Sequence, residues 1–180
     1  MPRLPLIQPD GATGAAAELL NGVQKTLGAT PNMMKAMANS PAALKAYLAF
    51  SEALAGGALR QADRERIALF VAQENACDYC LSAHTFLATK VAGLDESEAG
   101  KARRGDASDE RAKAVLVFTA SVLRGRGEVT DTDVDKAREA GMGEAEIAEI
   151  VAHIALNAFT NYFNKVAGTA VDWPLVRHDH

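Results

Sequence analysis

The chain's two cysteines lie in one short segment, Glu74–His84, together with a histidine. Cys77 and Cys80 are three residues apart, and His84 follows four residues after Cys80. Two thiols at this spacing can close to a disulfide, and an imidazole one helical turn away can take up or return a thiol proton. The segment therefore predicts a redox couple with its own base, and we expect a thiol-dependent redox enzyme.

A C-x-x-C pair also occurs in zinc sites, in haem attachment and as two inert buried thiols. Haem attachment is excluded because the histidine does not directly follow Cys80. Zinc could take both thiols and His84 but needs a fourth ligand. The chain's other histidines are His153, His178 and His180. Because we expect the two C-terminal ones to lie in a mobile tail, the redox interpretation is favoured over zinc and over inert thiols.

Helical spacing favours one reactive pair within the segment. On a helix Cys77, Cys80 and His84 lie along one stripe, with Cys80 and His84 adjacent as an i,i+4 pair. If the cysteines occupy the first turn, unpaired backbone N–H groups and the helix dipole stabilise a thiolate. Glu74 or Glu65 could supply a carboxylate, although the charged cluster around Glu65 is also typical of a solvated first helical turn.

Size and composition predict one ordinary enzyme domain spanning residues 1–180, with the redox motif at 65–84. The chain has 180 residues, 48% of them apolar and 23% charged, and a net charge of -4. Acidic and basic residues are interspersed, so we expect no nucleic-acid partner. No apolar run approaches the roughly 20 residues of a membrane span, and the N-terminus has no signal-like stretch, so we expect no membrane partner. Two cysteines in such a chain indicate a reducing, cytoplasmic setting.

The elements that must position the motif are helices, because apolar residues recur at helical spacing and no alternating run is long enough to build a sheet. We therefore expect an all-α fold. The expected helices are Ala15–Leu27, Pro41 to about Gly56, about Ala62–Glu74, about Asp78–Val91, Ser108 (as N-cap) to about Arg124, Thr130 or Thr132 to Gly141, and about Glu144–Val166.

The last of these helices is apolar nearly all round, so it is either central or packed against another subunit, and we favour a subunit interface for part of it. It also carries a polar stripe. The members of this stripe are His153, Asn157, Asn161 and Asn164. Buried structural hydrogen bonding is the favoured interpretation of the stripe, ahead of a direct role in an active site.

The motif resembles that of the redox-active branch of the alkylhydroperoxidase D and carboxymuconolactone decarboxylase superfamily. That branch has a glutamate, a C-x-x-C twelve residues later and a histidine four residues after the second cysteine, which fall here on Glu65, Cys77, Cys80 and His84 without insertion. Tyr79, between the cysteines, departs from alkylhydroperoxidase D, which has a histidine there.

Further stretches are similar to the peroxidase-related subgroup of this superfamily, namely Leu27–Asn32, the Ser40-Pro41 helix and Asn157–Asn164. The resemblance thus covers nearly the whole chain. It implies an alkylhydroperoxidase D-like helical bundle that assembles into a homo-oligomer built from trimers, either a trimer or a hexamer.

The resemblance also implies a peroxidase cycle. Cys80 would attack the O–O bond of a hydroperoxide and become a sulfenic acid, and Cys77 would resolve it as a Cys77–Cys80 disulfide. His84 and Glu65 would relay protons. An external dithiol, such as a lipoyl group on a protein partner, would reopen the disulfide, and no cofactor is implied.

Two other functions remain open. The first is a carboxymuconolactone-type decarboxylase, in which the cysteines are incidental, although that branch generally lacks this C-x-x-C-x-x-x-H pattern. The second is a non-enzymatic redox sensor or a zinc-stabilised interaction module.

Overall fold

The computed structural model describes residues 2–179, and within this range all regular elements are helical. The expectation of an all-α fold is confirmed. In chain order the elements are η1 (Pro9–Gly11), α1 (Gly14–Leu27), α2 (Asn32–Met37), α3 (Pro41–Ala55), α4 (Gln61–Glu74), α5 (Asp78–Lys90), α6 (Glu96–Arg103), α7 (Glu110–Arg124), α8 (Asp131–Glu139) and α9 (Glu144–Ala167).

Local capping chemistry sets several helix ends where the sequence predicts them. Ser40 Oγ accepts the Ala43 N–H at 3.3 Å, with Pro41 in the first turn of α3. Gly28 ends α1 in the left-handed conformation, at φ 71°. Thr130, and not Thr132, begins α8. These ends are predictable because cap and helix are neighbours in the chain.

The expected start of α7 is wrong by one residue. Asp109 is the N-cap, and its Oδ1 accepts the Ala112 N–H at 2.8 Å. Ser108 instead donates its hydroxyl to Glu98 Oε1 at 2.6 Å. A carboxylate makes the stronger contact to the positive end of the helix, and the serine is occupied elsewhere.

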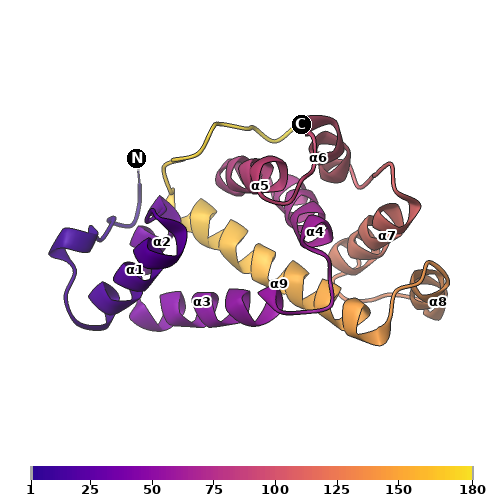
Figure 1. Cartoon of the computed structure of the whole chain (residues 1–180), viewed down its shortest axis with the longest axis horizontal. Coiled ribbons are helices and arrows are strands. Elements are labelled where there is room, and N and C mark those ends of the chain that lie inside the picture. Colours follow the sequence, from indigo (N-terminus) through magenta and orange to yellow (C-terminus); the bar gives the residue numbers. More distant parts are fainter. Residues whose placement is uncertain (1, 180) are drawn as a thin grey trace.

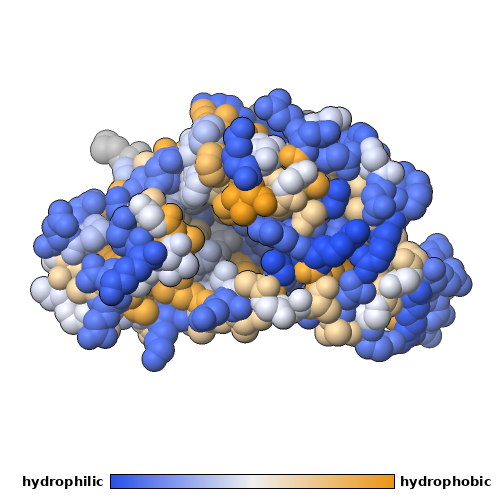
Figure 2. Space-filling view, in the orientation of Figure 1, coloured by the Kyte–Doolittle hydropathy of each residue, from blue (hydrophilic) through white to orange (hydrophobic). Residues whose placement is uncertain are grey.

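Helix α9 runs diagonally through the middle of the molecule, with α1–α3 to its lower left and α4–α7 to its upper right (Figure 1). Helix α4 packs against α5, α6, α7 and α9. The face seen in Figure 2 is hollowed between the N-terminal helices and the part of the molecule around α4 and α5. The central position of α9 allows one helix to reach groups on both sides of this hollow.

One face of α9 is buried, with Ile150 and Ile154 in the core, but part of its apolar surface faces outward. The exposed apolar side chains of α9 are Val151, Phe159, Tyr162 and Val166. The helix is therefore central, which was one of the two positions expected for it. The subunit interface stays a prediction. No described helix combines the length and apolar character that crossing a membrane requires.

The chain after α9 makes contacts with the rest of the molecule along its length as far as Asp179. This differs from the mobile tail that the sequence led us to expect. Trp173 packs against Phe86 with ring centroids 5.4 Å apart, and the Val176 N–H donates to Ser82 Oγ at 2.9 Å. This segment crosses the top of the molecule above α5 toward α6 in Figure 1. The contacts tie it to the helix that carries the cysteine motif.

Candidate active site

The cysteine motif lies where α4 turns into α5. The turn uses Ala76 at φ 50°, a left-handed conformation that is uncommon for residues other than glycine and costs of order 1 kcal/mol. Cys77 follows as the N-cap of α5, and its Sγ accepts the Cys80 N–H at 3.4 Å. The strained turn thus places Cys77 at the positive end of the helix, with Cys80 in its first turn.

The two thiols are in contact and almost fully buried. Cys77 Sγ and Cys80 Sγ are 2.7 Å apart, and the residues are 2% and 3% exposed. The structure holds both as free thiols. Since the sulfurs already touch, little rearrangement is needed to join them as a disulfide.

Glu65 and His84 pair across the α4–α5 junction. His84 Nδ1 lies 2.8 Å from Glu65 Oε2. Glu74, the other candidate carboxylate, makes a two-pronged contact with Arg124 at 3.1 and 2.8 Å. The structure therefore brings together the four residues predicted from the motif and assigns Glu74 to an ion pair with α7.

The pairing with Glu65 favours protonated His84. Burial opposes the charged imidazole, but the Glu65 carboxylate, its hydrogen bond and the negative charge of Cys77 outweigh burial and raise the pKa of His84. A histidine with a raised pKa can hold a proton near neutral pH and release it to a leaving group.

The two thiols differ in acidity, in the order opposite to that implied by the family roles. The hydrogen bond from the Cys80 thiol, the Cys80 N–H, and the charges of His84 and Lys165 lower the pKa of Cys77 against the effect of burial. Burial and the neighbouring Cys77 raise the pKa of Cys80 well above its usual value. In the reduced protein these effects favour the thiolate on Cys77 over Cys80.

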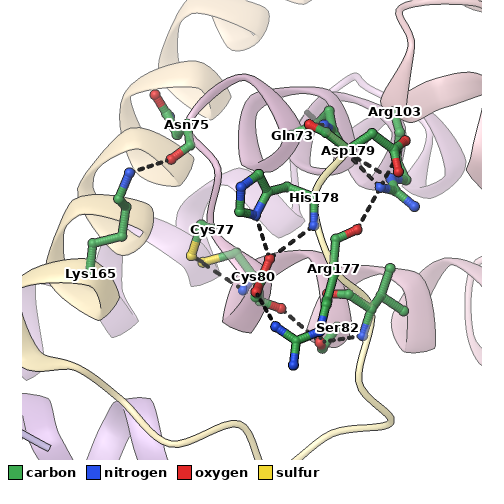
Figure 3. A network of polar contacts seen from close by, with 12 residues as sticks. Gln73, Asn75, Cys77, Cys80, Ser82, Arg103, Lys165, Arg177, His178 and Asp179 are labelled. Atoms are coloured by element: carbon green, nitrogen blue, oxygen red, sulfur yellow. Dashed lines mark hydrogen bonds and ion pairs between the residues drawn. The ribbon is translucent and has the colours of Figure 1, made fainter.

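Helix α9 contributes polar groups that sequence reasoning left out of the site. Asn164 Nδ2 donates to Cys80 Sγ at 3.3 Å, and Lys165 Nζ donates to the Asn75 carbonyl at 2.8 Å. Figure 3 shows Lys165 and Asn75 beside the two cysteines. The regular spacing of the α9 asparagines was the available signal, but it could not show that this face meets a sulfur.

Tyr47 of α3 also faces the site. Burial, and then the charges of Cys80 and Glu65, raise the pKa of Tyr47 to about 12. Its phenol therefore stays protonated at neutral pH. Tyr79 makes a structural contact away from the thiols. Its hydroxyl oxygen accepts the Met33 N–H at 3.1 Å and links α5 to α2.

Asp78, between the cysteines, is held by the C-terminal segment. His178 Nδ1 lies 2.7 Å from Asp78 Oδ1, which also accepts the His178 N–H at 2.9 Å. Arg177 lies 3.7 Å from the other carboxylate oxygen. The segment thereby covers the N-terminal turn of α5.

The zinc alternative finds no support in residues 2–179, where no three His, Cys, Asp or Glu side chains are arranged to hold a metal ion. His153 is buried on α9, with its Nε2 unpaired among the described atoms, and burial together with the Arg64 charge lowers its pKa. His178 is engaged by Asp78. His180 lies outside the described residues.

The fold is similar to several solved structures. An AhpD-core, peroxidase-related protein from Ralstonia eutropha JMP134 superposes with a TM-score of 0.85 at 24% identity, covering 95% of this chain and 92% of that one. A peroxidase-related protein from Silicibacter sp. TM1040 gives 0.79 at 25% identity, with 94% and 93% covered. The debrominase Bmp8 in complex with 2,3,4-tribromopyrrole gives 0.74 at 19% identity, with 96% and 94% covered.

Residues 41–116, from the start of α3 into α7, match the carboxymuconolactone decarboxylase family. No curated protein sequence matches the chain. The matched segment contains the whole cysteine motif and its glutamate partner.

Proposed function

We propose that this chain is a thiol-dependent peroxidase of the carboxymuconolactone decarboxylase and AhpD-like superfamily. The family match over residues 41–116 and the similarity to two peroxidase-related proteins support this proposal. The observation that carries the proposal is the contact between two buried thiols beside a Glu65–His84 pair. The two thiols supply a two-electron reductant and the Glu65–His84 pair supplies a proton donor. Reduction of a hydroperoxide needs both.

In the first step the Cys77 thiolate attacks one peroxide oxygen. An S–O bond forms as the O–O bond breaks, and Cys77 becomes a sulfenic acid. The departing alkoxide takes a proton from His84, whose raised pKa keeps that proton available. The sulfur loses two electrons, and the peroxide leaves as an alcohol.

In the second step Cys80 attacks the Cys77 sulfur. The S–S bond forms, the sulfenic hydroxyl leaves and is protonated to water, and the proton of Cys80 passes to the surrounding bases. The sulfurs lie 2.7 Å apart, so the second step needs little movement of either cysteine. These roles reverse those implied by the family resemblance, because the acidity of the thiols favours Cys77 as the first nucleophile.

An external dithiol then reopens the disulfide, with a lipoylated protein as one candidate. We also propose that the chain works as a homo-oligomer, a trimer or a hexamer. The exposed apolar row on α9 supports this part of the proposal, since a second copy would cover Phe159, Tyr162 and Val166.

The test is a peroxidase assay with an organic hydroperoxide and dihydrolipoamide as electron donor. Cys77→Ser and Cys80→Ser should each abolish turnover, whereas Glu74→Gln, which changes a carboxylate that pairs with Arg124, should retain it. Undiminished hydroperoxide reduction by either serine variant would sink the assignment. Carbon dioxide release from a lactone substrate by the double serine variant would support the decarboxylase alternative instead.

A further inference from the structure

Two asparagines of α9 lie against the sulfur of Cys80. Asn164 is 3% exposed and its Nδ2 donates to Cys80 Sγ at 3.3 Å. Asn161, one helical turn earlier, is 0% exposed and lies close enough for its amide to favour the Cys80 thiolate. Cys80 is thus a buried sulfur that has amide donors in place of water.

Hydrogen bonds orient both amides. Asn161 Oδ1 accepts the Asn75 Nδ2 at 3.0 Å, so the opposite end of the Asn161 amide is its donor. Asn164 Nδ2 is the atom that donates to Cys80 Sγ, and this contact orients the Asn164 amide. The donors therefore point toward the site where negative charge would develop.

Each amide keeps one buried atom without a partner of ordinary hydrogen-bond geometry. These atoms are Asn161 Nδ2 and Asn164 Oδ1. Buried amide groups normally find partners, so an unpaired donor beside a sulfur needs an explanation. A thiolate on Cys80 would supply one, since it accepts more and stronger hydrogen bonds than a thiol.

We propose that Asn164, assisted by Asn161, is a catalytic residue whose amide stabilises Cys80 whenever its sulfur carries negative charge. Within the proposed peroxidase cycle, on which these steps rest, that happens twice. Cys80 must itself be a thiolate when it attacks the Cys77 sulfenic acid. Later the external thiolate bonds to Cys77 Sγ, the Cys77–Cys80 bond breaks, and the electron pair stays on Cys80. Preorganised amide donors stabilise such charge without reorganising water.

Several other titratable groups lie around the two sulfurs and must be held constant in a test. They are Tyr47 of α3, Glu65 of α4, Cys77 at the N-cap of α5, His84 of α5 and Lys165 of α9. Cys77 interferes most directly, because its sulfur is 2.7 Å from that of Cys80. The measurement therefore uses protein in which Cys77 is serine, which leaves Cys80 as the chain's single thiol.

The experiment follows the rate of Cys80 alkylation by iodoacetamide against pH in Cys77→Ser protein, with no peroxide present. Adding Asn164→Ala or the isosteric Asn164→Asp should raise the midpoint by about one pKa unit, which is about tenfold slower alkylation below the midpoint. Asn157→Ala is the matched control, because its amide is also buried on α9 but donates to the His153 carbonyl. An unchanged midpoint in both Asn164 variants overturns the proposal.

A second measurement leaves Asn164 in place and so does not depend on its variants folding. In Cys77→Ser protein the side-chain amide resonance of Asn164 should shift with the same midpoint as Cys80 alkylation, and that of Asn157 should not. An Asn164 resonance whose chemical shift does not change at the Cys80 midpoint overturns the proposal. Because neither measurement uses peroxide, failure of the peroxidase assay and failure of this inference are separate results.

Discussion

Glu65 Oε2 lies 2.8 Å from His84 Nδ1, which joins α4 to α5 at the dithiol. This contact engages Nδ1, so proton exchange with a substrate falls to Nε2 of the imidazole. The carboxylate also favours the charged imidazole, which suits His84 to the proton donation proposed for the first step. The carboxylate therefore acts on the chemistry through the histidine.

Replacing Glu65 with Gln should lower the rate of peroxide reduction by roughly 10- to 100-fold, the usual scale for loss of acid–base assistance. Because the carboxylate raises the pKa of His84, its removal should move the loss of activity with rising pH to lower pH. Steady-state rates across pH test this. Glu74→Gln is the control, and an identical pH profile in both variants would contradict the role of Glu65.

The same pair should contribute to stability in a pH-dependent way. The folded-state pKa of His84 lies above its unfolded value of about 6.5, so the contribution is complete below that pH and is lost as pH rises through the folded-state value. Below pH 6.5, Glu65→Gln should reduce the free energy of unfolding by about 1 kcal/mol. Urea unfolding at several pH values measures this, and a difference that grows with pH would refute it.

The two thiols should react at different rates when studied singly. Cys77 in Cys80→Ser protein should be alkylated at neutral pH faster than Cys80 in Cys77→Ser protein, because the pKa of Cys77 is lowered and burial raises the pKa of Cys80. Mass spectrometry of the alkylated protein measures both rates. Faster alkylation of Cys80 would restore the roles implied by the family resemblance.

The C-terminal segment should stabilise the helix that carries the motif. Trp173→Ala removes the ring contact with Phe86 and should lower the free energy of unfolding by about 2 kcal/mol, less than for a fully buried tryptophan. Thermal or urea unfolding tests this. The comparison variant is Tyr162→Ala, which removes an exposed ring from α9 and should change the free energy of unfolding of monomeric protein less. Equal stability of the Trp173 variant and the wild type would show that the segment is only loosely attached.

The sequence predicts the helices whose caps and apolar faces are local, such as α1, α3 and α9. It does not reveal α2 or α6. Helix α2 has only six residues, and α6 (Glu96–Arg103) is polar along most of its length. Short helices of this kind depend on tertiary contacts, which periodicity does not report.

The candidate site was predictable because Glu65, Cys77, Cys80 and His84 lie on two consecutive helices and the turn that joins them. The order of thiol acidity was not. It depends chiefly on the burial of Cys80 and on the hydrogen bond between the two thiols, both of which tertiary packing sets. Helical spacing shows which residues share a face, but it does not show what that face meets.

The most direct test of the peroxidase cycle is a mass-spectrometric titration of the reduced protein with hydrogen peroxide and with an organic hydroperoxide. One equivalent of peroxide should convert the two thiols rapidly into a single intramolecular Cys77–Cys80 disulfide, and Cys80→Ser protein should accumulate a trappable sulfenic acid on Cys77. Thiols that remain reduced, or that oxidise no faster than a free cysteine, would contradict the account.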